Sequence, residues 1–111
     1  MTNELLRRRQ FKERVYVWSR KLDVDVQSLA VAVRPMARKW ASCSAAGNLT
    51  FNAELLDLRP DLQDYVIVHE LLHLSVPNHG KLWKALMRVH LGNWEGLERR
   101  LRLEPGTHGR V

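Results

Sequence analysis

The segment from Tyr65 to His73 constrains what this chain can fold into more than any other part of its sequence. It reads Tyr-Val-Ile-Val-His-Glu-Leu-Leu-His and is strongly apolar apart from two histidines and one glutamate. Pro60 and the carboxylates that follow it indicate a helix start, because proline suits the first helical position and negative charge suits the positive end of the helix dipole. Pro77 ends the pattern, so we expect one helix over residues 60–75. A glutamate and two histidines inside such a helix are costly to bury without partners.

His69 and His73 stand four positions apart, so on a helix both imidazoles project from the same face, one turn apart. Two neutral imidazole nitrogens at this spacing can bind a single Zn²⁺ at about 2.0–2.1 Å each. Glu70 lies about 100° around the helix from His69, beside such an ion and not on it. From there its carboxylate can take a proton from a water molecule whose pKa the metal lowers. The pattern His-Glu-x-x-His therefore predicts one zinc ion, with Glu70 as the general base.

A catalytic zinc site needs a third protein ligand and one open position for water. His79 is six residues beyond His73 and follows a turn with proline, so it can swing back toward the metal. Metzincins use the same spacing but carry a glycine three residues after the second histidine, where this chain has Val76. Glu95 and Glu98 on the following helix are competing ligands, in the manner of gluzincins such as thermolysin. We expect the third ligand to be His79.

Around these residues the sequence resembles a known family, the YgjP-like metallopeptidases, which are relatives of the SprT-like domains. The resemblance to the family's metal-binding signature is carried by His-Glu-Leu-Leu-His-Leu at 69–74, Pro-Asn-His-Gly at 77–80 and Leu-Trp at 82–83. Segments 38–44, 47–52 and 64–68 resemble its strand and pre-helix motifs.

The resemblance covers about residues 36–94 and implies a zincin fold. It also implies that His69, His73 and His79 hold the metal and that Glu70 is the base. In length the chain is similar to the minimal peptidases called minigluzincins, so its size is compatible with catalysis.

The remaining pattern indicates an α+β protein in which one helix and two or three short strands precede the other helices. We expect helices over 4–22, 60–75, 79–91 and from Trp94 onward, and strands over 25–33, 39–43 and 49–52. The last two strands flank a turn with Gly47 and Asn48 and predict a hairpin. The expected fold is a small zincin-like domain over 1–111, with a short antiparallel sheet, an active-site helix that carries HExxH, and flanking helices. Its metal-site region lies at about 36–94, and residues 105–111 form a loose tail.

Composition and charge limit the classes of binding partner that we expect for this chain. The chain has 45% hydrophobic and 27% charged residues, as globular proteins do. No apolar run is long enough to span a bilayer, and Met1–Arg9 has no apolar signal-peptide core, so we expect a cytoplasmic protein without a membrane partner. Residues 1–21 carry a net charge of +5 and 81–111 one of +4, whereas 40–80 carry −4. The basic ends could contact a nucleic acid or a nucleotide, although solvated outer helix faces explain the same pattern.

The leading function hypothesis is a zinc-dependent hydrolase that cleaves peptides or proteins. The strand at 49–52 could align an extended peptide by β-pairing. Tyr65, Asn52 and Arg38 are candidates for stabilising the negatively charged oxygen that forms in the reaction, and the sequence does not choose among them. Two alternatives stay open: a nucleoside triphosphate pyrophosphatase on the same metal site, and a DNA-associated protease or binding module.

Other residues that could carry chemistry have structural explanations. Cys43, the single cysteine, excludes an internal disulfide, and we expect it to be a small buried strand residue. We expect Trp40 and Trp83 to pack in the core or along a cleft wall. His90 is expected to pack against its neighbours, and His108, in the tail, is not expected to reach the metal.

Overall fold

The computed structural model describes residues 3–26, 31–44, 46–76 and 78–105, and shows an α+β fold. The helices are α1 (Asn3–Lys21), α2 (Pro60–Ser75), α3 (Lys81–Leu91) and α4 (Trp94–Arg102), and a short 3-10 helix, η2 (Ala53–Asp57), precedes α2. The strands are β1 (Val31–Arg34), β2 (Ala41–Cys43) and β3 (Leu49–Asn52). None of the described helices is long and apolar enough to cross a lipid bilayer.

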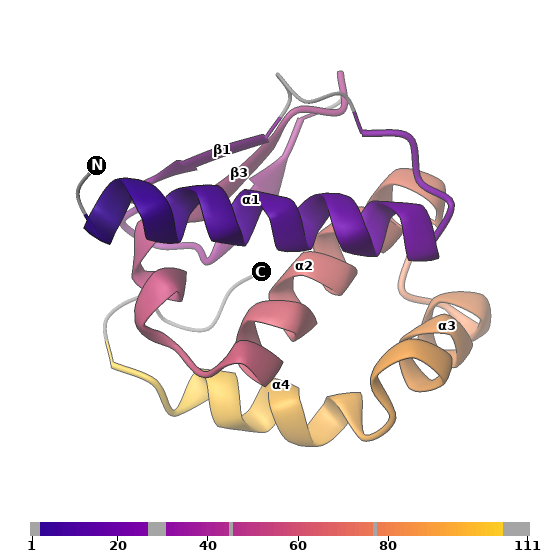
Figure 1. Ribbon diagram of the computed structural model, residues 1–111. Helices are drawn as coiled ribbons and strands as arrows, with labels where there is room; N and C mark the ends of the chain where they lie inside the picture. The colour runs from indigo at the N-terminus through magenta and orange to yellow at the C-terminus, as the bar shows by residue number, and fades with distance from the viewer. Residues whose placement is uncertain (1–2, 27–30, 45, 77, 106–111) are drawn as a thin grey trace.

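Helix α2 is the element that the others enclose. In Figure 1 it runs between α1 and α4, and it also contacts α3, η2 and β2. Every residue from Tyr65 to Leu72 is buried, including His69 and Glu70. A helix is buried on all its faces only when other elements cover each of them. The expected helix over 60–75 is thus confirmed, and its histidines and glutamate are held in the centre of the protein.

The sheet is mixed, which corrects the expected antiparallel sheet. Its strand order is β1-β3-β2: the β2–β3 hairpin is antiparallel, as predicted, but β1 pairs with β3 in parallel. Because β3 is the central strand, its two edges are occupied by its neighbours. The prediction that the strand at 49–52 aligns a substrate is therefore wrong, and β2 is an edge strand.

A buried asparagine holds the connection that produces this order. The chain leaves β1, crosses the end of β3 and enters β2 within residues 35–40. Asn52, at the end of β3, is completely buried, and its Nδ2 donates to the carbonyl oxygens of Met36 (3.0 Å) and Lys39 (2.9 Å). Its Oδ1 accepts from the backbone N–H of Glu54 (3.0 Å) and caps η2. One side chain thus satisfies two backbone carbonyls of the crossover and one backbone N–H of η2.

The end of α1 precedes the segment in which a strand was expected over 25–33. Asp23 adopts a positive φ of 54°, and the N–H of Val24 donates to the carbonyl of Ser19 (2.9 Å). This is a Schellman motif, which uses the residues after the helix to satisfy its last carbonyls. Residues 25 and 26, directly after this cap, are not in a strand, residues 27–30 lie outside the described part of the chain, and β1 is described from Val31.

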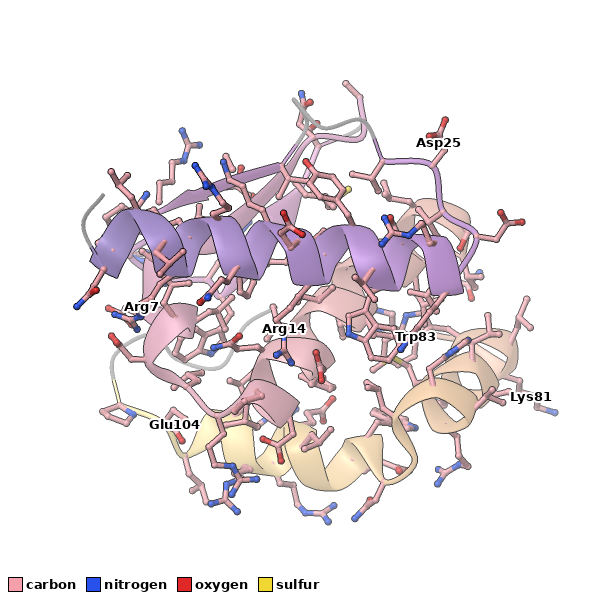
Figure 2. The ribbon with its side chains drawn as sticks, in the orientation of Figure 1. Arg7, Arg14, Asp25, Lys81, Trp83 and Glu104 are labelled. Carbon is pink, nitrogen blue, oxygen red and sulfur yellow. The ribbon has the colours of Figure 1, made fainter. Side chains whose placement is uncertain are left out.

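Several arginines of the basic N-terminal segment bond to the protein itself. Arg7 pairs with Asp57 at 2.6 Å, and Arg14 pairs with Asp64 of α2 at 2.7 Å. Arg8 donates to the carbonyl oxygen of Val33 at 2.6 Å. In Figure 2 Arg14 points from α1 toward α2. Part of the positive charge of α1 thus fastens it to η2, β1 and α2.

Replacing Asn52 with alanine should destabilise the fold by about 3 kcal/mol, because buried backbone groups lose their partners at about 1–3 kcal/mol each. Urea unfolding followed by circular dichroism measures this loss. Asn48→Ala, in the exposed hairpin turn, is the matched control and should cost far less. Equal losses in the two variants would show that Asn52 does not hold the crossover.

Candidate metal centre

Helix α2 fixes three of the residues that the sequence singled out. His69 and Glu70 are 5% and 3% exposed, whereas His73 lies one turn further on and is half-buried. The ring centroids of His69 and His73 are 4.7 Å apart. Glu70 points to another side of the helix, with its Oε1 3.8 Å from Nδ1 of His69. This is the expected arrangement of two imidazoles on one face with a carboxylate beside them.

His79 reaches the same place from the turn between α2 and α3. Helix α3 begins at Lys81, with Gly80 as its N-cap, so His79 precedes the helix instead of opening it as predicted. The side chain of Asn78 accepts from the N–H of Gly80 (3.0 Å), which tightens the turn before the cap. The Nε2 atoms of His79 and His73 are 3.0 Å apart. One nitrogen from each of the three histidines lies within 4.8 Å of the other two.

An indole ring supports this three-histidine cluster. Trp83 is 2% exposed and stacks on His79, with ring centroids 4.3 Å apart and an interplanar angle of 29°. It meets His69 edge-on at 5.1 Å and lies parallel to His73 at 6.4 Å. Figure 2 shows Trp83 directed toward the interior of the protein and Lys81, two residues earlier, directed away from it. Since His79 has no helix to orient it, its ring is held by this stacking and by the contact with His73.

The surroundings of His79 favour its neutral imidazole, the form that binds metals. Burial lowers the pKa of His79, and the neighbouring His69 and His73 lower it further. Nδ1 of His69 is buried without a hydrogen-bond partner among the described residues. Most buried polar atoms in proteins have a hydrogen-bond partner, and three indole nitrogens, those of Trp40, Trp83 and Trp94, share this lack of one here. Three converging imidazoles are also a donor set that suits Zn²⁺ and leaves one position open, so the residues present fit a zinc ion.

Neither of the competing glutamates belongs to this cluster. Glu95 forms an ion pair with Arg88 at 2.9 Å on the protein surface. Glu98 accepts from the phenol of Tyr65 (3.0 Å) through Oε2 and from Arg102 (3.1 Å) through Oε1. Both carboxylates thus have partners other than the histidines.

A cavity of about 420 Å³ opens beside the cluster. It is lined by Tyr65, His69, His79, Trp83, Lys84, Trp94, Glu98 and Arg102. Of the three candidates for stabilising a negatively charged oxygen, Tyr65 alone lines this cavity. Burial raises the pKa of its phenol, and the Glu98 carboxylate raises it further, so the phenol stays protonated. Asn52 is committed to the strand crossover, and Arg38 is exposed outside the cavity.

The remaining candidates divide between the core and the surface. Trp40 is fully buried, as expected. Cys43 is half-buried instead of fully buried, because β2 is an edge strand; burial raises the pKa of its thiol, and the charge of Glu70 raises it further. His90 packs edge-on against Trp18, with ring centroids 6.2 Å apart. His108 lies outside the described residues.

A family model described as the YgjP-like metallopeptidase domain matches residues 3–104. The chain belongs to this family. The solved structure of the metallopeptidase zymogen of Methanocaldococcus jannaschii jannalysin is similar to it, with a TM-score of 0.65 and 21% sequence identity over 83% of this chain and 90% of that chain. At this identity the likeness establishes the fold. The comparison with curated proteins gave no match.

The family match extends well beyond the 36–94 region on which the sequence resemblance rested, and includes α1 and α4 of this YgjP-like protein. Sequence reasoning missed Lys84, Trp94 and Arg102 as lining residues of the cavity. They come from α3 and α4, and no spacing rule relates them to the HExxH pattern. The one available signal was the position of Lys84, five residues after His79.

We predict that Trp83→Leu weakens zinc binding by about 10–100-fold, the usual effect of losing a group that orients a metal ligand. Trp83→Phe keeps an aromatic ring against His79 and should lose less. Competition with a chelator, followed by calorimetry, measures the affinity.

Trp94→Phe is the matched control, because Trp94 contacts Trp83 edge-on at 5.4 Å and lines the same cavity. Thermal unfolding of the metal-free variants separates the loss of metal binding from the loss of stability. Unchanged zinc affinity in Trp83→Leu would refute the orienting role.

Proposed function

We propose that this YgjP-like chain is a zinc-dependent peptidase of the HExxH type, in which His69, His73 and His79 hold one zinc ion and Glu70 is the general base. The observation that carries this proposal is the convergence of three imidazoles from two separate segments, with a buried carboxylate at the next position of the central helix. The family supports a metal-dependent peptidase in general, and the donor set supports zinc.

Zinc bound in such a site lowers the pKa of a water molecule and polarises the carbonyl group that is attacked. The protein supplies the rest. Helix α2 fixes His69 and His73, and Trp83 orients His79, so the three donors need little rearrangement to converge. A site whose donors are already in position loses little conformational entropy on binding.

Glu70 is our candidate for moving the proton. It is 3% exposed and lies next to His69, with Oε1 3.8 Å from Nδ1 of that imidazole. We infer that it accepts the proton of the attacking water and passes it to the leaving amine, as a general base that then becomes a general acid. The phenol of Tyr65 is a neutral donor in the cavity wall and is the remaining candidate for the developing oxyanion.

A peptide substrate can align on β2. Its partner β3 occupies one edge, and no other described strand pairs with the second edge. Strand β2 packs on α2, and the charge of Glu70 acts on Cys43 at the end of β2. An extended peptide added at the second edge would thus run beside the proposed base.

The two other hypotheses, a nucleoside triphosphate pyrophosphatase and a DNA-associated protease or binding module, gain less support. Within the described ranges, the three histidines form the single group of at least three His, Cys, Asp or Glu whose ligand atoms converge, so no acidic two-metal centre for phosphate chemistry accompanies them. Among the basic residues of α1, Arg7 and Arg14 bond to Asp57 and Asp64 in place of an external polyanion. Contact with nucleic acids or nucleotides and a cytoplasmic location stay predictions.

Replacing Glu70 with glutamine should abolish peptide cleavage while zinc content stays at one ion per chain, because the amide keeps the shape of the side chain but cannot accept a proton. Cleavage of an unstructured protein and hydrolysis of nucleoside triphosphates are measured side by side on the same zinc-loaded preparation. Glu95→Gln, a change at an exposed ion pair, is the control and should keep full activity. Peptide cleavage at the unmodified rate by Glu70→Gln would refute the mechanism, and hydrolysis of nucleotides alone would refute the substrate class.

A further inference from the structure

The cavity beside the three-histidine cluster has an uncompensated positive charge. Three of its lining residues are ionic: Lys84 on α3, and Glu98 and Arg102 on α4. The Glu98 carboxylate accepts from Arg102 at 3.1 Å and from the Tyr65 phenol at 3.0 Å, so its charge is balanced within the wall. Lys84 is exposed, and no ion pair of the described residues includes it, so the ionic residues that line the cavity have a net charge of +1.

The position of the cavity makes that charge relevant to a substrate. His69 and His79 line it, so a bond cleaved at the cluster has a neighbouring residue in or beside this space. Aromatic rings of Tyr65, Trp83 and Trp94 form much of the wall. Apolar walls strengthen the attraction between a substrate charge and an ammonium group, and the exposed Lys84 keeps part of its hydration.

We propose that this cavity binds a carboxylate on the substrate residue next to the cleaved bond, and that Lys84 selects for it. This rests on the proposed peptidase function and names its substrate class: peptides with Asp or Glu beside the scissile bond. A cationic side chain at that position meets Lys84 and Arg102 and is disfavoured. Lys84 is a specificity residue and takes no part in the proton transfer assigned to Glu70.

The cleavage test uses peptides blocked at both ends that differ in one residue, Glu, Gln or Lys, placed on either side of the scissile bond in turn. At one of these positions the zinc-loaded enzyme should prefer Glu over Gln by about threefold to fivefold in kcat/KM, the effect of one partly screened ion pair. The difference should lie in KM. Lys84→Gln should abolish the preference, and Lys84→Glu should reverse it in favour of Lys.

Lys81→Glu is the matched control, because it makes the same charge change on the same helix. Lys81 points into solvent (Figure 2) and does not line the cavity. It should retain the preference for Glu. The proposal is overturned if Lys84→Glu leaves the order of kcat/KM among the three peptides unchanged. It is also overturned if Lys81→Glu changes that order as much as Lys84→Glu does.

Binding to the zinc-loaded Glu70→Gln variant, followed by tryptophan fluorescence, separates this inference from the peptidase function. Tighter binding of the Glu peptide that disappears in the double variant Glu70→Gln/Lys84→Gln supports the carboxylate site even if no peptide is cleaved. Equal binding of all three peptides overturns it even if cleavage is observed.

Two further ligands identify the source of the anion. The first is a Gln peptide whose chain ends at the tested position, so that its only carboxylate there is the C-terminal one. It should bind as tightly as the Glu peptide only if the cavity binds a chain terminus. A nucleoside triphosphate that displaces the Glu peptide at lower concentration, and does so through Lys84, would overturn the carboxylate assignment in favour of a phosphate.

Discussion

An imidazole and a carboxylate, those of His69 and Glu70, lie side by side in the most buried stretch of the chain, and the rest of the structure is arranged around that fact. Apolar packing does not compensate a buried imidazole nitrogen or a buried carboxylate. Helices α1, α3 and α4 and strand β2 all pack on α2 and bury both groups, of which His69 lines the cavity. In the function that we propose, a cation at the cluster offsets the cost of burying these polar groups. The same residues would then limit how the chain can fold and carry out the reaction.

The three histidines are held in two different ways. His69 and His73 belong to a helix whose geometry fixes their spacing, whereas His79 belongs to a turn and depends on the ring of Trp83. The site therefore connects three segments: Trp83 of α3 stacks on His79 of the turn and meets His69 of α2 edge-on. Binding of a metal ion would tie these segments together, and we expect the free energy of unfolding to rise with the logarithm of the ion's concentration divided by its Kd.

The sequence predicted the elements whose signals are local. Pro60 and Pro77 marked α2 correctly, and the spacing of the three histidines predicted side chains that the structure brings within 4.8 Å of one another. The strand expected over 25–33 was predicted too early at residues 25 and 26, which follow the Schellman cap of α1 around Asp23, a feature that depends on backbone conformation. The order of the strands could not be predicted, since it follows from the crossover that Asn52 holds. Lys84 lines the cavity because α3 packs on α2. No spacing of residues in the sequence predicts this tertiary contact.

The most direct measurement is anomalous diffraction at the zinc absorption edge from crystals of the protein grown with equimolar zinc. We expect one strong peak, bonded to a nitrogen of each of His69, His73 and His79, with a further position open to solvent on the side of Glu70. A peak bonded to Glu98 in place of His79, or an empty cluster with the rings turned apart, would contradict the proposed centre.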